Sequence, residues 1–188
     1  MIINITKINN TKTKVLCPAK MKFEDIKIKL PEKEDSIKNF FENCEKRKKF
    51  VNEPPEHYKN HLKKAKHDLT RAIAEFKDEC WDWTIIKSYY SLHHAGNALL
   101  SKNKNIFSKD HSCLIIALKY YDLIDKSLFE ELIKIDKKFS DTLSLDLMFQ
   151  LRKIGQYSVD EWEDLSKEDA ELILNIAKKF IKFAEEKI

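Results

Sequence analysis

Arg152 is the residue of this chain whose chemistry best suits phosphate. The sequence holds 35 lysines plus arginines, and of these only Arg47, Arg71 and Arg152 are arginine. A guanidinium is planar, permanently charged and able to bind phosphate or carboxylate through two N–H groups at once. Arg152 follows the apolar-rich run 143–151, so the sequence predicts that its guanidinium lies beside the hydrophobic core.

The residues after Arg152 limit what it could do. A histidine separated from it by four to six residues would give an acid/base site for RNA, but positions 157 to 159 read Tyr-Ser-Val. Gln156 shares a helix face with Arg152 because it lies four positions on, and Tyr157 is its neighbour. This Arg–Gln–Tyr patch could bind phosphate, ribose or carboxylate, yet it lacks a group that titrates near neutrality. Arg152 could equally pair with a nearby carboxylate in a purely structural role.

Histidines and tyrosines form a second group of candidates. Tyr90, His93 and His94 lie on the run 88–96, and His111 follows Ser108 by three positions. Neighbouring helical residues point about 100° apart, so His93 and His94 do not form the metal pair of a His-x-x-x-His motif. In the first helical turn, the dipole disfavours protonation of His111. Packing is the more typical role for Tyr90, His93 and His111, and a binding role stays open.

A metal or cofactor site is not expected. His57 and His61 share a helix face, but no third ligand stands in register with them. The four cysteines, at 17, 44, 80 and 113, match no zinc spacing. With two glycines in the whole chain, phosphate-binding glycine loops and the nucleophile elbow are excluded. We therefore predict no metal and no cofactor.

The elements that must position these residues are predicted to be helical. Charged residues make up 35% of the chain, with two Gly and four Pro, and such a composition favours helices. Residues 1–31 form an extended or β-like arm, and residues 32–188 form an all-α, up-and-down bundle of five to six main helices. The helices are predicted over 34–50, 56–79, 81–101, 108–121, 125–139 and 143–157, followed by one from 166 to the end.

Local signals add detail to this bundle. The helix over 81–101 is apolar round most of its circumference and should be central, with Ala95 and Gly96 allowing another helix to come close. Ser108 is a plausible N-cap. Ser166 and Asp169 have the spacing of a capping box.

Charge and cysteine content bear on location and partners. The net charge is +4, with lysine and glutamate interspersed, so the composition does not indicate a dedicated nucleic-acid binder, and DNA is not an expected partner. Scattered cysteines indicate free thiols in a reducing compartment. Neither a signal peptide nor a membrane span is predicted, because the longest apolar run is 113–118. We expect a cytoplasmic protein.

Four segments together resemble the HEPN superfamily, the higher eukaryotes and prokaryotes nucleotide-binding domain, in a small prokaryotic branch. They are residues 83–103, 108–112, 151–157 and 166–170, and the resemblance covers roughly residues 56–188. It implies a homodimeric helical bundle with the arginine helices at the dimer cleft. It also implies metal-independent RNA cleavage by Arg-x4–6-His, and a nucleotidyltransferase partner in toxin–antitoxin-like modules. Arg152 matches the family arginine, and Tyr157 stands where the histidine is expected.

Three hypotheses arise from the sequence. The first is a degenerate HEPN-like protein that binds nucleotide, RNA or a nucleotidyltransferase through Arg152, Gln156 and Tyr157, with His93, Tyr90 and His111 as further binding residues. The second is an active endoribonuclease toxin in which His93 or His111 replaces the missing histidine in space. The third is a structural helical module in which Arg152 is a buried ion pair.

Overall fold

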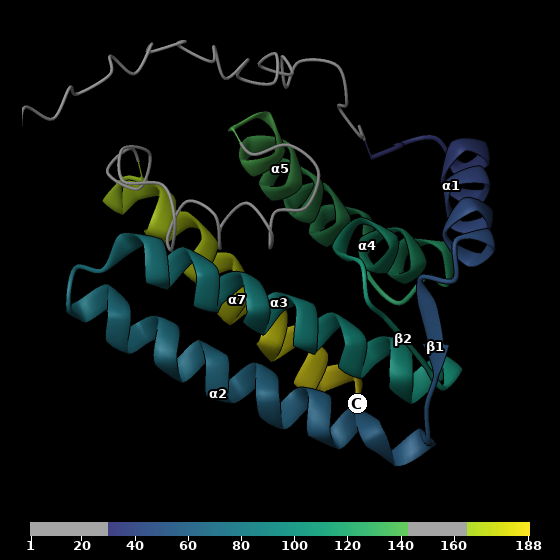
Figure 1. Ribbon diagram of the computed structural model, residues 1–188, viewed down its shortest axis with the longest axis horizontal. Helices are drawn as coiled ribbons and strands as arrows, with labels where there is room; N and C mark the ends of the chain where they lie inside the picture. Colours follow the sequence, from purple (N-terminus) through teal and green to yellow (C-terminus); the bar gives the residue numbers. More distant parts are fainter. Residues whose placement is uncertain (1–29, 143–164) are drawn as a thin grey trace, which may run out of the picture.

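The computed structural model describes residues 30–142 and 165–188, with side chains described for 30–134 and 165–188 (Figure 1). Residues 1–29 of the predicted arm and the predicted helix that carries Arg152, Gln156 and Tyr157 lie outside the described residues.

The predicted all-α bundle is confirmed. Most predicted helix ends lie within three or four residues of those observed. The helices are α1 (Glu34–Lys46), α2 (Tyr58–Lys77), α3 (Trp81–Lys104), α4 (His111–Tyr120), α5 (Lys126–Thr142) and α7 (Lys167–Lys187), with a 3-10 turn, η2 (Pro55–His57), before α2.

Helix α3 is the centre of the bundle, as its apolar circumference predicts. It packs against α2, α4 and α7, and Figure 1 shows α2 running alongside it. Small residues on α3 let its neighbours approach: Ser91 is fully buried and donates a 3.0 Å hydrogen bond to the backbone oxygen of Ala65 on α2. Gly96 does the same for α4, since a Cβ there would lie 3.0 Å from the side chain of Leu114.

Two helix caps differ in how well the sequence predicted them. The capping box of Ser166 and Asp169 is present at the start of α7, as predicted. The prediction of Ser108 as the N-cap of α4 is wrong: Asp110 takes that place, and its carboxylate accepts the Cys113 N–H at 3.0 Å. Ser108 instead ends a strand and is buried.

A small sheet joins the two ends of the α2–α3 hairpin. Strand β1 (Phe50–Asn52) pairs antiparallel with β2 (Ile106–Ser108), with Phe50 opposite Ser108. The sequence pattern predicted helix at position 50 and no strand at 106–108, because three-residue strands separated by two helices show no periodicity. This sheet fixes the loop from which α4 begins.

The expectation of free thiols is wrong for two of the cysteines. Cys44 on α1 and Cys113 on α4 form a disulfide, while Cys80 is free. The Arg47 guanidinium lies 3.7 Å from the Cys44 sulfur and 3.6 Å from the Cys113 sulfur. Disulfides are usual in oxidising compartments and also occur inside hyperthermophiles, so the cytoplasmic location stays a prediction.

Candidate functional site

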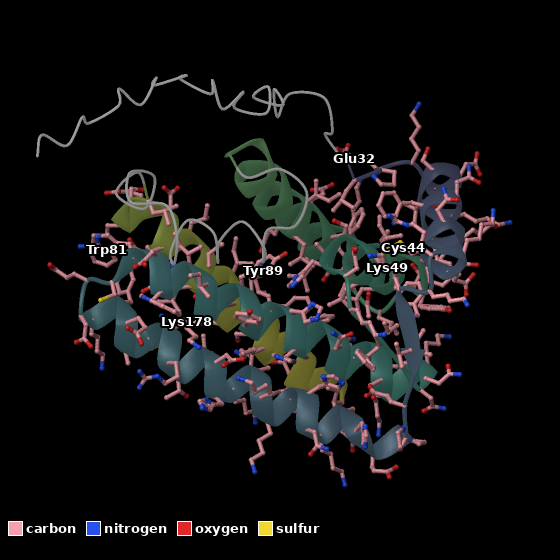
Figure 2. All side chains as sticks on the ribbon, viewed as in Figure 1. Glu32, Cys44, Lys49, Trp81, Tyr89 and Lys178 are labelled. Carbon is pink, nitrogen blue, oxygen red and sulfur yellow. A yellow bond between two sulfur atoms is a disulfide. The ribbon has the colours of Figure 1, made fainter. Side chains whose placement is uncertain are left out.

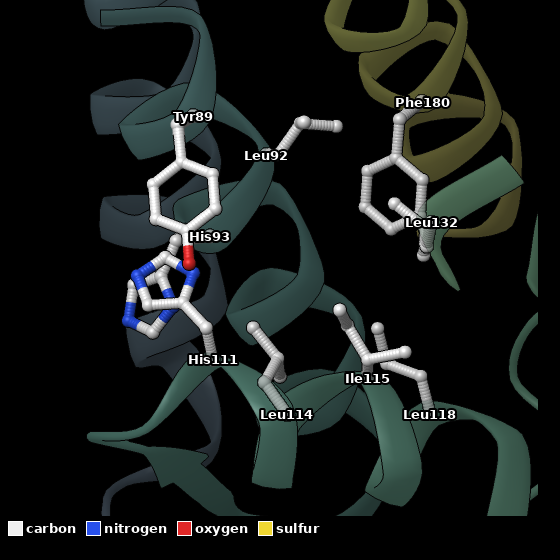
Figure 3. Close-up of a pocket in the computed structure, with 9 residues that line it drawn as sticks. All are labelled: Tyr89, Leu92, His93, His111, Leu114, Ile115, Leu118, Leu132 and Phe180. Atoms are coloured by element: carbon white, nitrogen blue, oxygen red, sulfur yellow. The ribbon is translucent and has the colours of Figure 1, made fainter. Parts of the chain in front are cut away.

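Three aromatic rings form a stack between α3 and the start of α4 (Figure 3). Tyr89 and His93 lie one helical turn apart on α3, and His111 is the first residue of α4. The His111 ring lies 4.0 Å from the Tyr89 ring and 3.9 Å from the His93 ring, measured between centroids. We call these three residues the imidazole stack.

Asn97 holds the stack in place. It lies one turn beyond His93 and is buried, and its Oδ1 accepts the Ser108 N–H at 2.7 Å. Its Nδ2 donates to the Ser108 backbone oxygen at 3.1 Å and lies 3.0 Å from Nε2 of His93. Because an amide N–H₂ can only donate, Nε2 of His93 is the acceptor and its proton sits on Nδ1. That buried Nδ1 has no hydrogen-bond partner in the described structure.

A row of further histidines leads from the stack to the surface. His94 lies beside His93, and its Nε2 is 4.0 Å from the buried carboxylate of Asp68. His61 on α2 lies 6.0 Å from the His94 ring and bonds Glu53 at 3.1 Å. Glu53 thus joins the His57–His61 pair as an acceptor that the sequence pattern did not reveal.

Burial and mutual repulsion keep the stacked imidazoles neutral. Burial, then the neighbouring His94 and His61, lower the pKa of His93 to about 3. Burial, then His93 and His94, hold the pKa of His111 well below its ordinary value. For His94, burial lowers the pKa to about 4 against the opposing pull of Asp68. Near neutral pH, all three rings are therefore uncharged.

A small apolar cavity borders the stack. Its volume is about 30 Å³, which is close to the room that one water molecule needs. Besides the stack it is lined by Leu92, Leu114, Ile115, Leu118, Leu132 and Phe180. A nucleobase is far larger than this cavity, and His93 and His111 are half-buried beside it.

Within the described ranges, no group of three or more His, Cys, Asp or Glu side chains is placed to hold a metal ion. The helices of those same ranges include none with both the length and the apolar character of a membrane span.

The structure brings together two of the residues singled out from the sequence. His93 and His111 are in contact, whereas Tyr90 is half-buried and packs against the hydrophobic core. Tyr89 and Asn97 were missed, although Tyr89, His93 and Asn97 recur at steps of four on one helix face, a spacing that could have revealed them. Arg152, Gln156 and Tyr157 lie outside the described residues.

A family model described as HEPN domain matches residues 58–187, which include the whole imidazole stack but neither α1 nor β1. No curated protein matches the chain.

Proposed function

The chain belongs to the HEPN domain family, and from that premise we propose that it binds RNA or a nucleotide at the imidazole stack without cleaving it. Family membership supports nucleotide binding, RNA binding or a ribonuclease-like function in general. In this proposal Arg152 contacts phosphate, Gln156 and Tyr157 add hydrogen bonds, and the stack contacts an unpaired base.

The contact of three planar rings between α3 and α4 carries the proposal, and the lowered pKa values of the two histidines agree with it. RNA cleavage needs an acid that can give a proton to the leaving oxygen, and an uncharged imidazole with a pKa near 3 does not do so readily at neutral pH. Planar, neutral rings instead suit contact with an unpaired base. The lowered pKa values and the planar rings of the stack therefore favour RNA or nucleotide binding over RNA cleavage.

Tyr157 adds support from the sequence. A tyrosine hydroxyl has an ordinary pKa near 10 and is a poor base at neutral pH. It can still donate a hydrogen bond to a phosphate oxygen, which suits a binding role.

One observation favours ribonuclease activity as a second candidate. His93 and His111 are in contact at 3.9 Å between ring centroids, and two neighbouring imidazoles could share acid and base roles. A bound phosphate would raise the pKa of both rings, because an opposite charge favours the protonated form. On this alternative, cleavage would depend on both histidines.

A combined binding and cleavage assay separates these candidates. Labelled single-stranded RNA is titrated with the purified protein in EDTA and then run on a gel. The variants are Arg152→Ala, Tyr157→Phe and His111→Ala, with His67→Ala as the matched control because His67 is exposed on α2. We expect uncut RNA in every case and weaker binding by Arg152→Ala, His111→Ala and Tyr157→Phe, with the binding of His67→Ala unchanged. Cleavage that disappears in folded Arg152→Ala would overturn the proposal.

A homodimer and a nucleotidyltransferase partner are the assemblies that the resemblance implies, and both stay predictions. Sedimentation of the purified chain tests the first. Co-expression with a nucleotidyltransferase encoded beside this chain, followed by co-purification, tests the second.

A further inference from the structure

The end of the molecule where β1 and β2 pair is strongly basic. Residues 46–56 and 102–111 contain seven cations and three carboxylates. We call this surface the basic end, and its cations are Lys46, Arg47, Lys48, Lys49, Lys102, Lys104 and Lys109.

Contacts between four elements hold these cations together. The backbone oxygen of Lys49 accepts the Lys109 N–H at 3.0 Å, directly beside the β1–β2 ladder. Lys102 lies over the Tyr58 ring at 4.5 Å and Lys104 over the Tyr121 ring at 4.4 Å. The cations therefore come from the end of α1, the end of α3 and the two strand ends.

Carboxylates compensate part of this charge, and Glu45, exposed on the last turn of α1, is a fourth carboxylate beside the three counted above. Asp110 caps α4 and lies 3.3 Å from Lys49, and Glu53 is occupied by His57 and His61. Glu56 is exposed beside them. The side chains of Lys46, Lys48 and Lys109 form no hydrogen bond or ion pair within the described residues.

The opposite end of the bundle carries the opposite charge. Figure 2 places Trp81, at the α2–α3 turn, far from Cys44 and Lys49. Around that turn lie four carboxylates against Lys77, and one of them, Glu75, pairs with Arg71 at 3.0 Å; the four are Glu75, Asp78, Glu79 and Asp82. Burial and the carboxylates of Glu75, Asp82 and Asp78 raise the pKa of the Cys80 thiol there. The small net charge of +4 thus hides a strong division of charge along the bundle.

The basic end adjoins the imidazole stack. Lys49 contacts Asp110, and the next residue, His111, belongs to the stack. Ser108 on β2 is held by Asn97, which also contacts His93. A chain of phosphates lying over the cations would therefore lead to the stack.

We infer that the basic end binds the phosphate backbone of single-stranded RNA, so that the stack receives a base within an RNA chain rather than a free nucleotide. The inference rests on the proposed function and names its ligand. A single strand fits this surface because the cations can contact its phosphates, and the half-buried rings of Tyr58 and Tyr121 beside them can contact its unpaired bases. Residues 46–49 precede the segment 58–187 that the family model matches. Four of the seven cations of the basic end therefore lie outside the matched domain.

The test compares two variants of equal charge change. The first is Lys46→Gln/Lys48→Gln/Lys109→Gln at the basic end. The matched control is Lys77→Gln/Lys167→Gln/Lys178→Gln, at exposed positions away from it. Affinity for a single-stranded RNA and for a mononucleotide is measured across a range of salt concentrations, after folding is checked by circular dichroism.

We expect the basic-end variant to bind the RNA roughly tenfold more weakly near physiological salt and to lose about two from the slope of log K against log[salt], since each phosphate contact on a single strand contributes about 0.7. Mononucleotide affinity and the control variant should stay unchanged. Equal RNA affinity and slope in both variants would overturn this inference alone. Absence of RNA and nucleotide binding by every form would overturn the proposed function with it. If poly-glutamate displaces the RNA as strongly as unlabelled RNA does, the basic end binds any polyanion, which would also overturn this inference.

Discussion

At the scale of single residues, the site is defined by the hydrogen bonds of Asn97 and by the contacts between the histidine rings. Asn97 bonds both backbone groups of Ser108 and donates to His93, which fixes the tautomer of that ring. The His93 and His111 rings then lie in contact with each other, and burial lowers their pKa values so that they are neutral near pH 7. The sequence predicted His93 and His111 as candidates, but their contact depends on where β2 and α4 begin, and local patterns do not reveal that.

The neutral histidines should make the fold sensitive to acid. Their folded-state pKa values lie below the ordinary value of 6.5, so between that value and about 4 the unfolded chain binds more protons. The stability present above 6.5 is lost as pH falls through this window, by at most about 1.4 kcal/mol per pH unit for each histidine. Urea unfolding at several pH values measures this. His111→Phe should flatten the dependence, and exposed His67→Gln should not; equal slopes in the two variants would contradict the assignment.

Loss of Asn97 should destabilise the protein and displace His93. Asn97→Ala leaves two buried backbone groups of Ser108 without partners, which we expect to cost about 2–4 kcal/mol of unfolding free energy. Asn60→Ala, at an exposed position on α2, should change stability by less than about 0.5 kcal/mol. Denaturant unfolding of the two variants compares them, and equal stability would show that Asn97 plays no positioning role.

At the scale of elements, helices were predictable and the connections between them were not. The periodicity of α2, α3 and α7 follows from apolar residues at steps of three and four, and the capping box of α7 is a local pattern. The pairing of β1 with β2 joins segments more than fifty residues apart. The Cys44–Cys113 bond spans 69 residues. Such partners are set by the packing of the whole bundle.

The disulfide should contribute strongly to stability, because it ties α1 to the helix that begins with His111. For a loop of 69 residues, the chain-entropy model gives about 4 kcal/mol. Cys44→Ser/Cys113→Ser should therefore melt at a lower temperature than the unaltered chain and show no further effect of a thiol reductant. Cys80→Ser removes the free thiol and should keep both the melting temperature and its response to reductant. A reductant that leaves the melting temperature of the unaltered chain unchanged would contradict the role of the bond.

At the scale of the whole molecule, the two ends of the bundle differ in charge. Composition indicated only a modest net charge of +4 with lysine and glutamate interspersed. Folding gathers residues 46–49, 102–104 and 109 at one end and the carboxylates of the α2–α3 turn at the other (Figure 2). Electrostatic attraction of a polyanion should therefore act on one end of the protein and should weaken as salt screens it.

Binding of RNA without cleavage at the imidazole stack is best tested by titrating labelled single-stranded RNA with the unaltered protein and with His111→Ala, and then recovering the RNA on a gel. We expect saturable binding, intact RNA, and affinity at least about fivefold weaker in the variant, since base stacking contributes about 1–3 kcal/mol. RNA that is cut in EDTA, or bound equally well by folded His111→Ala, would contradict binding without cleavage at this stack.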